Sequence, residues 1–205
     1  HVYRPRTLEL PTELRTVRAA PVQRRRDGSA PSNAPRNLVL HGPSLRSWPD
    51  ADPVPDVQLV LEHAGRCLPP EKAAVLMESA LHRGVLNLTA VQRIVASLPH
   101  DARRALSRVR ADAESGTETT VRWWFESRGV KVRSQVPFPE GGRRMDLLVG
   151  RSWVIECDSR EFHDDPGSYD EDRERDLHLA LHGYRVTRLS WEQVFLRWEE
   201  TQAML

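Results

Sequence analysis

The sequence predicts an α/β fold of the α+β type: a mixed four-stranded sheet flanked by helices, preceded by a small, mainly helical region with short strands. Three observations lead to this prediction. Residues 1–55 contain nine of the fifteen prolines, residues 57–110 show helical spacing of apolar side chains, and residues 115–205 alternate helical and strand patterns. We therefore expect an N-terminal domain at 1–110 and a C-terminal domain at 111–205.

The first 55 residues favour neither long helices nor central strands, because proline interrupts both. Asn37–His41 is a short apolar patch that suits a strand in a small sheet. Arg24, Arg25 and Arg26 lie just before Asp27 and Gly28 in a turn-like context. A solvated loop and a contact to the DNA backbone are both open for this cluster.

Capping signals and apolar periodicity predict the elements of the remaining chain. Before residue 111 we expect helices at Glu71–Arg83, from Thr89 to about Leu98, and from Asp101 to about Arg110. After it we expect helices at Thr117–Arg128, Tyr169–His182 and from Trp191 to about Gln202. The expected strands are Val130–Val136, Arg143–Val149, Ser152–Asp158 and Tyr184–Leu189. We expect Trp123–Phe125 to be buried largely against the sheet, and Trp191, Val194, Phe195 and Trp198 to form a core stripe.

Two of the predicted strands carry acids where a core strand should have none. Asp146 lies in the first, and Glu156 and Asp158 lie in the second. A buried carboxylate costs several kcal/mol unless it is paired or binds a metal. A two-residue loop at Gly150 would pair Val149 with Ser152, whereas a three-residue loop pairs Val149 with Trp153 and places Asp146 opposite Glu156. We expect the second register, because one buried face then holds Met145, Leu147, Val149, Trp153, Ile155 and Cys157.

Only oxygen ligands converge in that register. They are the carboxylates of Asp146 and Glu156 and the backbone carbonyl of Cys157, with Asp158 as a third carboxylate on the same face. Two carboxylates so close repel each other unless a proton or a cation lies between them. Oxygen ligands suit Mg²⁺ or Mn²⁺ better than Zn²⁺. The sequence therefore predicts a magnesium or manganese site between these strands.

Two further residues are candidates for supporting roles. Glu118 has two open explanations, a capping box with Ser115 and an outer-sphere contact to the metal. His163 follows the acids in the next loop, where it could act as a general acid or base. An exposed surface histidine is the alternative for His163.

Composition and charge limit the class of protein. Residues 1–47 have nine basic against three acidic side chains (net +6), residues 48–113 are neutral, and residues 114–205 have 13 basic against 18 acidic (net −5). The basic beginning suits phosphate contacts, and the candidate DNA-binding residues are Arg24, Arg25, Arg26, Arg144, Arg160 and Arg175. Cys67 and Cys157 alone exclude a disulfide framework, and neither a membrane span nor a signal peptide is evident. We expect a cytoplasmic protein; its first residue, His1, is typical of a processed or trimmed chain.

Residues 115–205 resemble the PD-(D/E)XK nuclease superfamily, most closely its very-short-patch-repair-like branch of small actinobacterial domains. The resemblance is carried in order by Met145–Gly150, Ile155–Asp158, His163, Arg175-Asp176 and Gly183–Trp191. It implies a restriction-endonuclease-like fold that hydrolyses DNA phosphodiester bonds. The implied Mg²⁺ is held by Asp146, Glu156 and the Cys157 carbonyl, helped by Glu118.

Two positions depart from the superfamily's pattern. Asp158 replaces the usual lysine two residues after Glu156, and in the repair-like branch a histidine of the following loop is the substitute, which points to His163. Ser159 stands where that branch often has glycine. The middle of the chain also looks like proteins in which such a domain follows a winged-helix unit, related to abortive-infection toxin–antitoxin regulators.

Three hypotheses follow. The first is a metal-dependent DNA endonuclease of repair or phage defence, with the catalytic residues Glu118, Asp146, Glu156, Asp158 and His163. The second is a catalytically inactive, nuclease-fold DNA-binding regulator of the toxin–antitoxin type, and the third is a structural interaction module. The missing lysine favours the second hypothesis, whereas the retained acids and histidine favour the first, which we prefer.

Overall fold

The computed structural model describes residues 2–3, 19–21, 38–41, 55–138, 143–158 and 166–205. The chain divides into two compact units, His1–Asp56 and Val57–Leu205, and each is described by itself. In the first unit, three short parallel strands form a sheet in the order β1-β3-β2: β1 (Val2–Tyr3), β2 (Ala19–Pro21) and β3 (Leu38–His41). The strand expected at Asn37–His41 is therefore confirmed.

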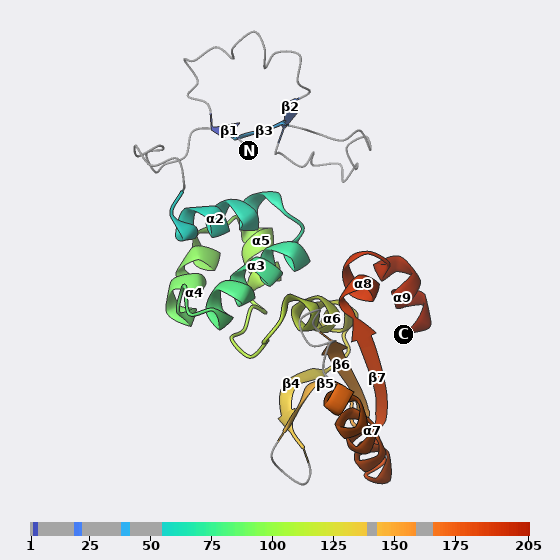
Figure 1. The fold of residues 1–205 in the computed structure, drawn as a ribbon. Helices are drawn as coiled ribbons and strands as arrows, with labels where there is room; N and C mark the ends of the chain where they lie inside the picture. The colour runs from blue at the N-terminus through green and yellow to red at the C-terminus, as the bar shows by residue number, and fades with distance from the viewer. Residues whose placement is uncertain (1, 4–18, 22–37, 42–54, 139–142, 159–165) are drawn as a thin grey trace. The chain divides into compact units, whose positions relative to one another are not determined.

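Four helices begin the second unit (Figure 1): α2 (Val57–Cys67), α3 (Pro70–His82), α4 (Leu88–Ser97) and α5 (His100–Leu106). Pro70 is the first residue of α3, and the Asn87 side chain caps α4 by accepting the Ala90 N–H at 2.9 Å. Their apolar faces share one core that includes Met77, Val91 and Leu106. The helical character predicted for residues 57–110 is confirmed.

The helix expected to reach Arg110 ends instead at Leu106. The Arg110 N–H donates to Glu78 Oε1 at 3.0 Å rather than to a carbonyl one turn earlier. A contact with α3 thus replaces the helical hydrogen bond, and local sequence patterns carry no sign of such a contact.

A mixed four-stranded sheet follows, in the order β4-β5-β6-β7. Its strands are β4 (Val132–Pro137), β5 (Arg144–Val149), β6 (Trp153–Asp158) and β7 (Arg185–Ser190). The first three are antiparallel neighbours, and β7 runs parallel to β6 after a crossover through α7 (Pro166–Leu181). The predicted mixed sheet with flanking helices is confirmed.

Helices cover both faces of this sheet (Figure 1). On one face, α6 (Gly116–Ser127), α8 (Trp191–Phe195) and α9 (Trp198–Met204) pack on a core that includes Val121, Leu147, Ile155 and Val194. On the other face, Leu179 of α7 packs against Leu148 and Val154. The described helices include none that is long and apolar enough to cross a membrane.

Helix α6 also contacts α3, so the boundary expected at residues 110 and 111 lies inside the second unit. Trp123 of α6 is buried in the core of the four helices and not against the sheet, which corrects the expectation for this residue. Phe125 packs on the sheet as expected. Consecutive residues on a helix point about 100° apart, which is why α6 contributes to two cores.

The face predicted for Met145 is wrong. Met145 packs with Leu148 and Val154, on the opposite face from Leu147. The β4–β5 ladder skips the pair Gln135 and Asp146, and Gln135 has a positive φ of 52°, so the alternation of side chains is interrupted beside Met145.

The last helix is divided into α8 and α9, because the Arg197 N–H donates to the Glu192 carbonyl, five residues earlier, at 3.0 Å. Phe195, expected in the core stripe, is 40% exposed.

Candidate acidic site between two strands and two helices

The turn between β5 and β6 brings the predicted acids together. Val149 pairs with Trp153 and Leu147 with Ile155, which confirms the three-residue loop. Gly150 has a φ of +61°, a conformation in which any other residue is strained. Continued by one residue, the same register brings Asp146 across from Glu156.

Asp146 is tied directly to the end of β6. Its Oδ2 accepts the Cys157 N–H at 2.8 Å. The N–H and C=O of a strand residue point to the same side, so the Cys157 carbonyl also points toward β5. Burial raises the pKa of the Cys157 thiol well above its usual range, so the thiol stays protonated. The carbonyl, not the sulfur, is the group that Cys157 can offer to a cation.

Glu156 is buried, with 3% of its surface exposed, and it meets an arginine from α7. Arg175 Nη2 donates to Glu156 Oε1 at 2.8 Å and to the Arg144 carbonyl at 2.9 Å. From the sequence, Arg175 was a candidate DNA-binding residue. The observed partner lies 19 residues away on β6.

Glu118 enters the same region from α6 and is 4% exposed. Ser115 Oγ accepts the Glu118 N–H at 3.1 Å, as in a capping box, but the Glu118 carboxylate accepts the Glu114 N–H, at 3.1 Å, and not that of Ser115. Gln135 Nε2 of β4 donates to the same oxygen, Oε2, at 2.9 Å. The two explanations of Glu118 are therefore compatible, because its backbone is capped while its side chain turns toward β4.

The carboxylate of Asp146 repels those of Glu118 and Glu156. Burial and then the charge of Asp146 raise the pKa of Glu118 to about 7 and that of Glu156 to about 8. Burial also raises the pKa of Asp146, opposed by the Cys157 N–H and by Arg175. Arg175 and Arg188 do not fully compensate these acids, of which Glu118 and Glu156 are buried and Asp146 is partly buried, so the site holds protons near neutral pH or requires another cation.

Asp158 belongs to a neighbouring ion-pair cluster. Its Oδ1 lies 3.8 Å from Nη1 of Arg188, whose Nη2 lies 2.9 Å from Asp176 Oδ1 on α7. Arg188 stands across from Glu156 in the parallel β6–β7 register and lowers the pKa of Glu156. Asp158 lies on the Glu156 side of β6, as expected, but it has its own basic partner.

The available donors fit a magnesium ion only in part. Among the described residues, no three His, Cys, Asp or Glu side chains are arranged as a complete metal-binding group. Mg²⁺, however, is commonly held by one or two carboxylates, with water and substrate phosphate completing its six ligands. Asp146, Glu156 and the Cys157 carbonyl meet that requirement, and the raised pKa values of the carboxyls are what an uncompensated cation site would show.

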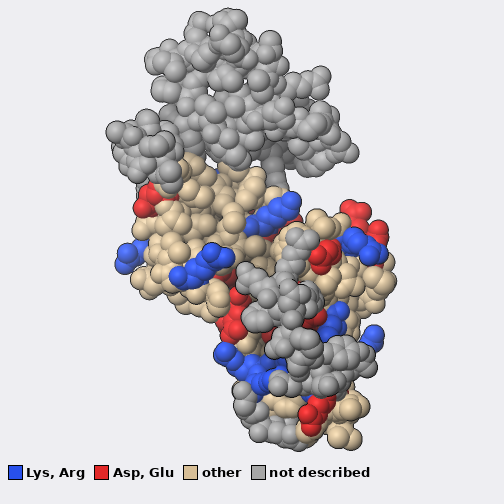
Figure 2. Space-filling model, viewed as in Figure 1, with Lys and Arg blue, Asp and Glu red and all other residues tan. Residues whose placement is uncertain are grey.

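The remaining predicted residues are separated from this site or fall outside the description. Arg144 is exposed, and its Nη2 lies 2.8 Å from Glu114 Oε1. Figure 2 shows Lys and Arg side chains gathered over the part of the unit where β4 and β5 run, with acidic side chains beside them. Outside the described side chains lie Arg24, Arg25, Arg26, Arg160 and His163.

Sequence reasoning missed Gln135 and Arg188 as neighbours of the site. Nothing in a strand pattern indicates the positive φ of Gln135, which coincides with the break in the β4–β5 ladder beside Asp146. The position of Arg188 could have been predicted from the strand register, because a parallel β6–β7 pair aligned at Glu156 places this basic residue opposite Glu156.

Comparisons of the chain with protein-family models, with curated proteins and with solved structures found no match.

Proposed function

We propose that the protein is a metal-dependent DNA endonuclease with a restriction-endonuclease-like fold and a PD-(D/E)XK type of site. The observation that carries the proposal is the convergence of Glu118, Asp146 and Glu156 on a site in which Arg175 pairs with Glu156, while the pKa values of Glu118 and Glu156 are still raised. Buried or partly buried acids that repel each other are costly for folding, so a protein that keeps Glu118, Asp146 and Glu156 together gains something from the cation they attract.

The residues have distinct roles in this proposal. Mg²⁺ or Mn²⁺ would be held by Asp146, Glu156 and the Cys157 carbonyl. Glu118 would accept hydrogen bonds from water bound to that ion. The ion would lower the pKa of a bound water and stabilise the charge that develops on the phosphate. Arg175 holds the Glu156 carboxylate in place and is within reach of a phosphate oxygen at the same site. Asp158 orients Arg188, and His163 serves as the general acid or base.

DNA is the proposed substrate because phosphodiesters are recognised by arginine and by a bound cation together. Arg144, whose exposed guanidinium pairs with Glu114, is a proposed contact to the DNA backbone. Arg24, Arg25, Arg26 and Arg160 are further proposed backbone contacts. We propose that the protein acts in the cytoplasm, in DNA repair or in defence against phage.

The test is nicking of supercoiled plasmid by the full chain with Mg²⁺ and with EDTA. We expect cleavage in Mg²⁺ alone and its loss in Asp146→Asn, which keeps the shape of the side chain but removes its charge. Asp101→Asn is the matched control, because Asp101 is an exposed acid at the start of α5. Equal cleavage by wild type and Asp146→Asn would refute the assignment.

One observation favours a second candidate, an inactive nuclease-fold regulator of the toxin–antitoxin type. Asp158 replaces the catalytic lysine of the superfamily and pairs with Arg188, while Arg175 already pairs with Glu156. Such a regulator would bind DNA in a salt-sensitive manner and leave it intact in Mg²⁺, Mn²⁺, Co²⁺ and Ca²⁺. Gel-shift and nicking assays on the same samples separate the two candidates.

A further inference from the structure

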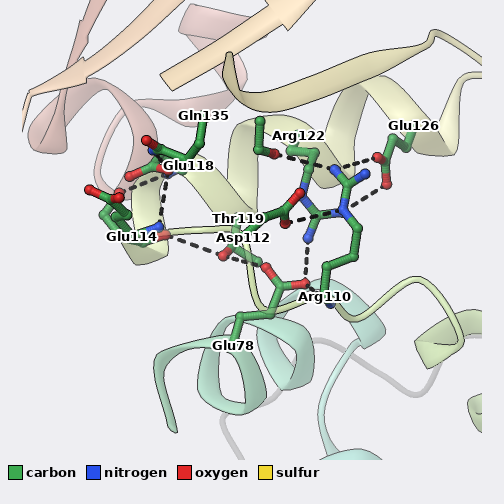
Figure 3. Close-up of polar contacts among 11 residues, drawn as sticks. Glu78, Arg110, Asp112, Glu114, Glu118, Thr119, Arg122, Glu126 and Gln135 are labelled. Carbon is green, nitrogen blue, oxygen red and sulfur yellow. Dashed lines mark hydrogen bonds and ion pairs between the residues drawn. The ribbon is translucent and has the colours of Figure 1, made fainter. Parts of the chain in front are cut away.

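A second group of charged residues lies between α3 and α6, remote in sequence from the acids of β5 and β6 (Figure 3). Glu78 of α3 is 1% exposed and Arg122 of α6 is completely buried. Glu78 Oε1 accepts from Arg122 Nη2 and, at 3.0 Å, from the Arg110 N–H. Glu78 Oε2 accepts from the Thr119 hydroxyl at 2.7 Å. Both oxygens of this carboxylate are therefore occupied by donors from α6 and from the segment before it.

Arg122 and Arg110 extend the network across α6. Arg122 Nη1 donates to Glu126 Oε2 at 2.9 Å, and Arg110 Nη2 lies 3.0 Å from the other Glu126 oxygen, Oε1. Arg110 Nη2 also donates to Ser134 Oγ of β4 at 3.3 Å. The network thus links the helix α3, the segment before α6, the helix α6 and the first strand of the sheet.

Stability alone does not explain a buried network of this kind. Desolvation of an ion pair largely cancels its attraction, and apolar residues of similar size are often as stable. What the network does provide is a single geometry, because a guanidinium that bonds to two carboxylates allows little sliding or rotation of α6 against α3.

The same helix carries the network and a member of the acidic site. Glu118, Arg122 and Glu126 are spaced by four residues, so they follow one stripe of α6, and four residues rise about 6 Å. Figure 3 shows Glu118 on the same helix as Arg122, with Glu118 turned to Gln135 and Arg122 turned to Glu78 and Glu126. A rotation or shift of α6 would therefore move Glu118 as well.

Strand β4 supplies a second connection. Ser134 accepts from Arg110, and the next residue, Gln135, donates to Glu118 Oε2 at 2.9 Å. The donor that orients the Glu118 carboxylate is thus adjacent to a residue bonded to the network. Both the helix that carries Glu118 and the strand that orients it are tied to Glu78 through Arg122 and Arg110.

We propose that Glu78 is a positioning residue for the acidic site: its ion pair with Arg122 fixes α6 so that the Glu118 carboxylate faces Asp146. The four helices α2, α3, α4 and α5 of the second unit then help to position the acidic site and are not independent of it. The role of Glu118 in catalysis rests on the proposed function, whereas the dependence of its position on Glu78 does not.

A double-mutant cycle on the full chain tests this dependence without metal or DNA. Unfolding equilibria are measured for wild type, Glu78→Gln, Glu118→Gln and the double variant. Sites without shared partners are additive to within about twofold in the equilibrium constant. We expect the effects of Glu78→Gln and Glu118→Gln to deviate from additivity by about fivefold or more.

Two further variants keep the cycle interpretable. Thr119→Val removes the hydroxyl that donates to Glu78 and also lies 3.2 Å from the Ser115 carbonyl, so it should fold and should also be non-additive with Glu118→Gln. Val91→Ala truncates a buried residue of α4 in the helical core outside the network, and it should be additive with Glu118→Gln. Additivity of both Glu78→Gln and Thr119→Val with Glu118→Gln overturns the inference.

Cleavage assays then separate this inference from the proposed function. If the wild type cleaves DNA, Glu78→Gln should lower kcat about fivefold or more at an unchanged KM for DNA, and Val91→Ala should change neither. An equal loss of kcat in both variants would overturn the positioning role. If the wild type does not cleave, the proposed function fails, and the outcome of the cycle still decides whether Glu78 positions Glu118.

Discussion

The Glu78–Arg122 network and the acidic site of Glu118, Asp146 and Glu156 are both buried, both charged and both contacted by α6, yet they are compensated differently. Glu78 receives three donors, of which one belongs to a fully buried arginine. Glu156 receives one arginine, and its pKa is still raised to about 8. Burial of an acid therefore does not indicate a binding site by itself. The informative feature is a buried acid whose charge the protein leaves uncompensated.

The largest expected difference is in stability. Arg122→Ala should lower the free energy of unfolding by about 3–5 kcal/mol, because Glu78 and Glu126 lose the guanidinium that both contact. Asp146→Ala in metal-free protein should lower the free energy of unfolding far less, since it removes the charge that repels Glu118 and Glu156. Urea unfolding measures both. Arg197→Ala, which breaks an exposed pair with Glu200, is the control and should change little. Equal losses in Arg122→Ala and Asp146→Ala would remove the distinction between the two groups.

The acidic site should also make metal-free stability depend on pH. The pKa values of Glu118 and Glu156 are raised to about 7 and about 8, so the folded protein binds more protons than the unfolded chain between roughly pH 4.5 and 8. Stability therefore falls as the pH rises through this window, by on the order of 3 kcal/mol for the two coupled groups. Denaturation at several pH values should show that the free energy of unfolding falls with pH in the wild type. It should fall less steeply in the double variant Glu118→Gln/Glu156→Gln. Parallel slopes would contradict it.

Substitutions of Arg175 and of Arg188 should differ in their effect on the affinity of the acidic site for Mn²⁺, and this is a smaller effect. Arg175→Gln removes the cation that competes for Glu156, so Mn²⁺ affinity should rise about tenfold, as measured by calorimetry with Asp101→Asn as the reference. Arg188→Gln should have a weaker effect, because the closest acid to Arg188 is Asp176, at 2.9 Å. Weaker Mn²⁺ binding by Arg175→Gln would mean that Arg175 supports the site and does not compete for it.

The smallest expected effect concerns the turn on which the acidic site depends. Gly150→Ala should lower the free energy of unfolding by about 1 kcal/mol, since alanine is strained at the φ of +61°. Gly150→Asn should cost less, because asparagine tolerates this conformation better. Thermal unfolding measures both variants. A Gly150→Ala protein as stable as wild type would show that the turn adapts.

The sequence predicted the hairpin correctly because its information is local. Glycine at residue 150 and apolar residues on both sides allow one register that also brings Asp146 and Glu156 together, and the Val149–Trp153 pair confirms it. The prediction that Met145 shares a face with Leu147 failed at the interrupted pair Gln135 and Asp146, where strict alternation no longer applies.

The partners of the acids were not predictable in the same way. Arg175 reaches Glu156 across 19 residues, and Glu78 reaches Arg122 across 44. Glu78 occupies an ordinary position in α3, and only the packing of α3 against α6 makes it a buried acid. No pattern of spacing along the chain contains this information.

The sequence by itself determined the order of the main helices and strands, the mixed four-stranded sheet and the register of the β5–β6 hairpin. Caps, periodicity and turn residues act over a few positions, so the sequence pattern contains this information. Tertiary structure decided which charges are compensated. It paired Asp158 with Arg188, paired Glu156 with Arg175, and surrounded Glu78 with donors. The physical reason is that the energy of a charge depends on its burial and on neighbours brought from distant parts of the chain.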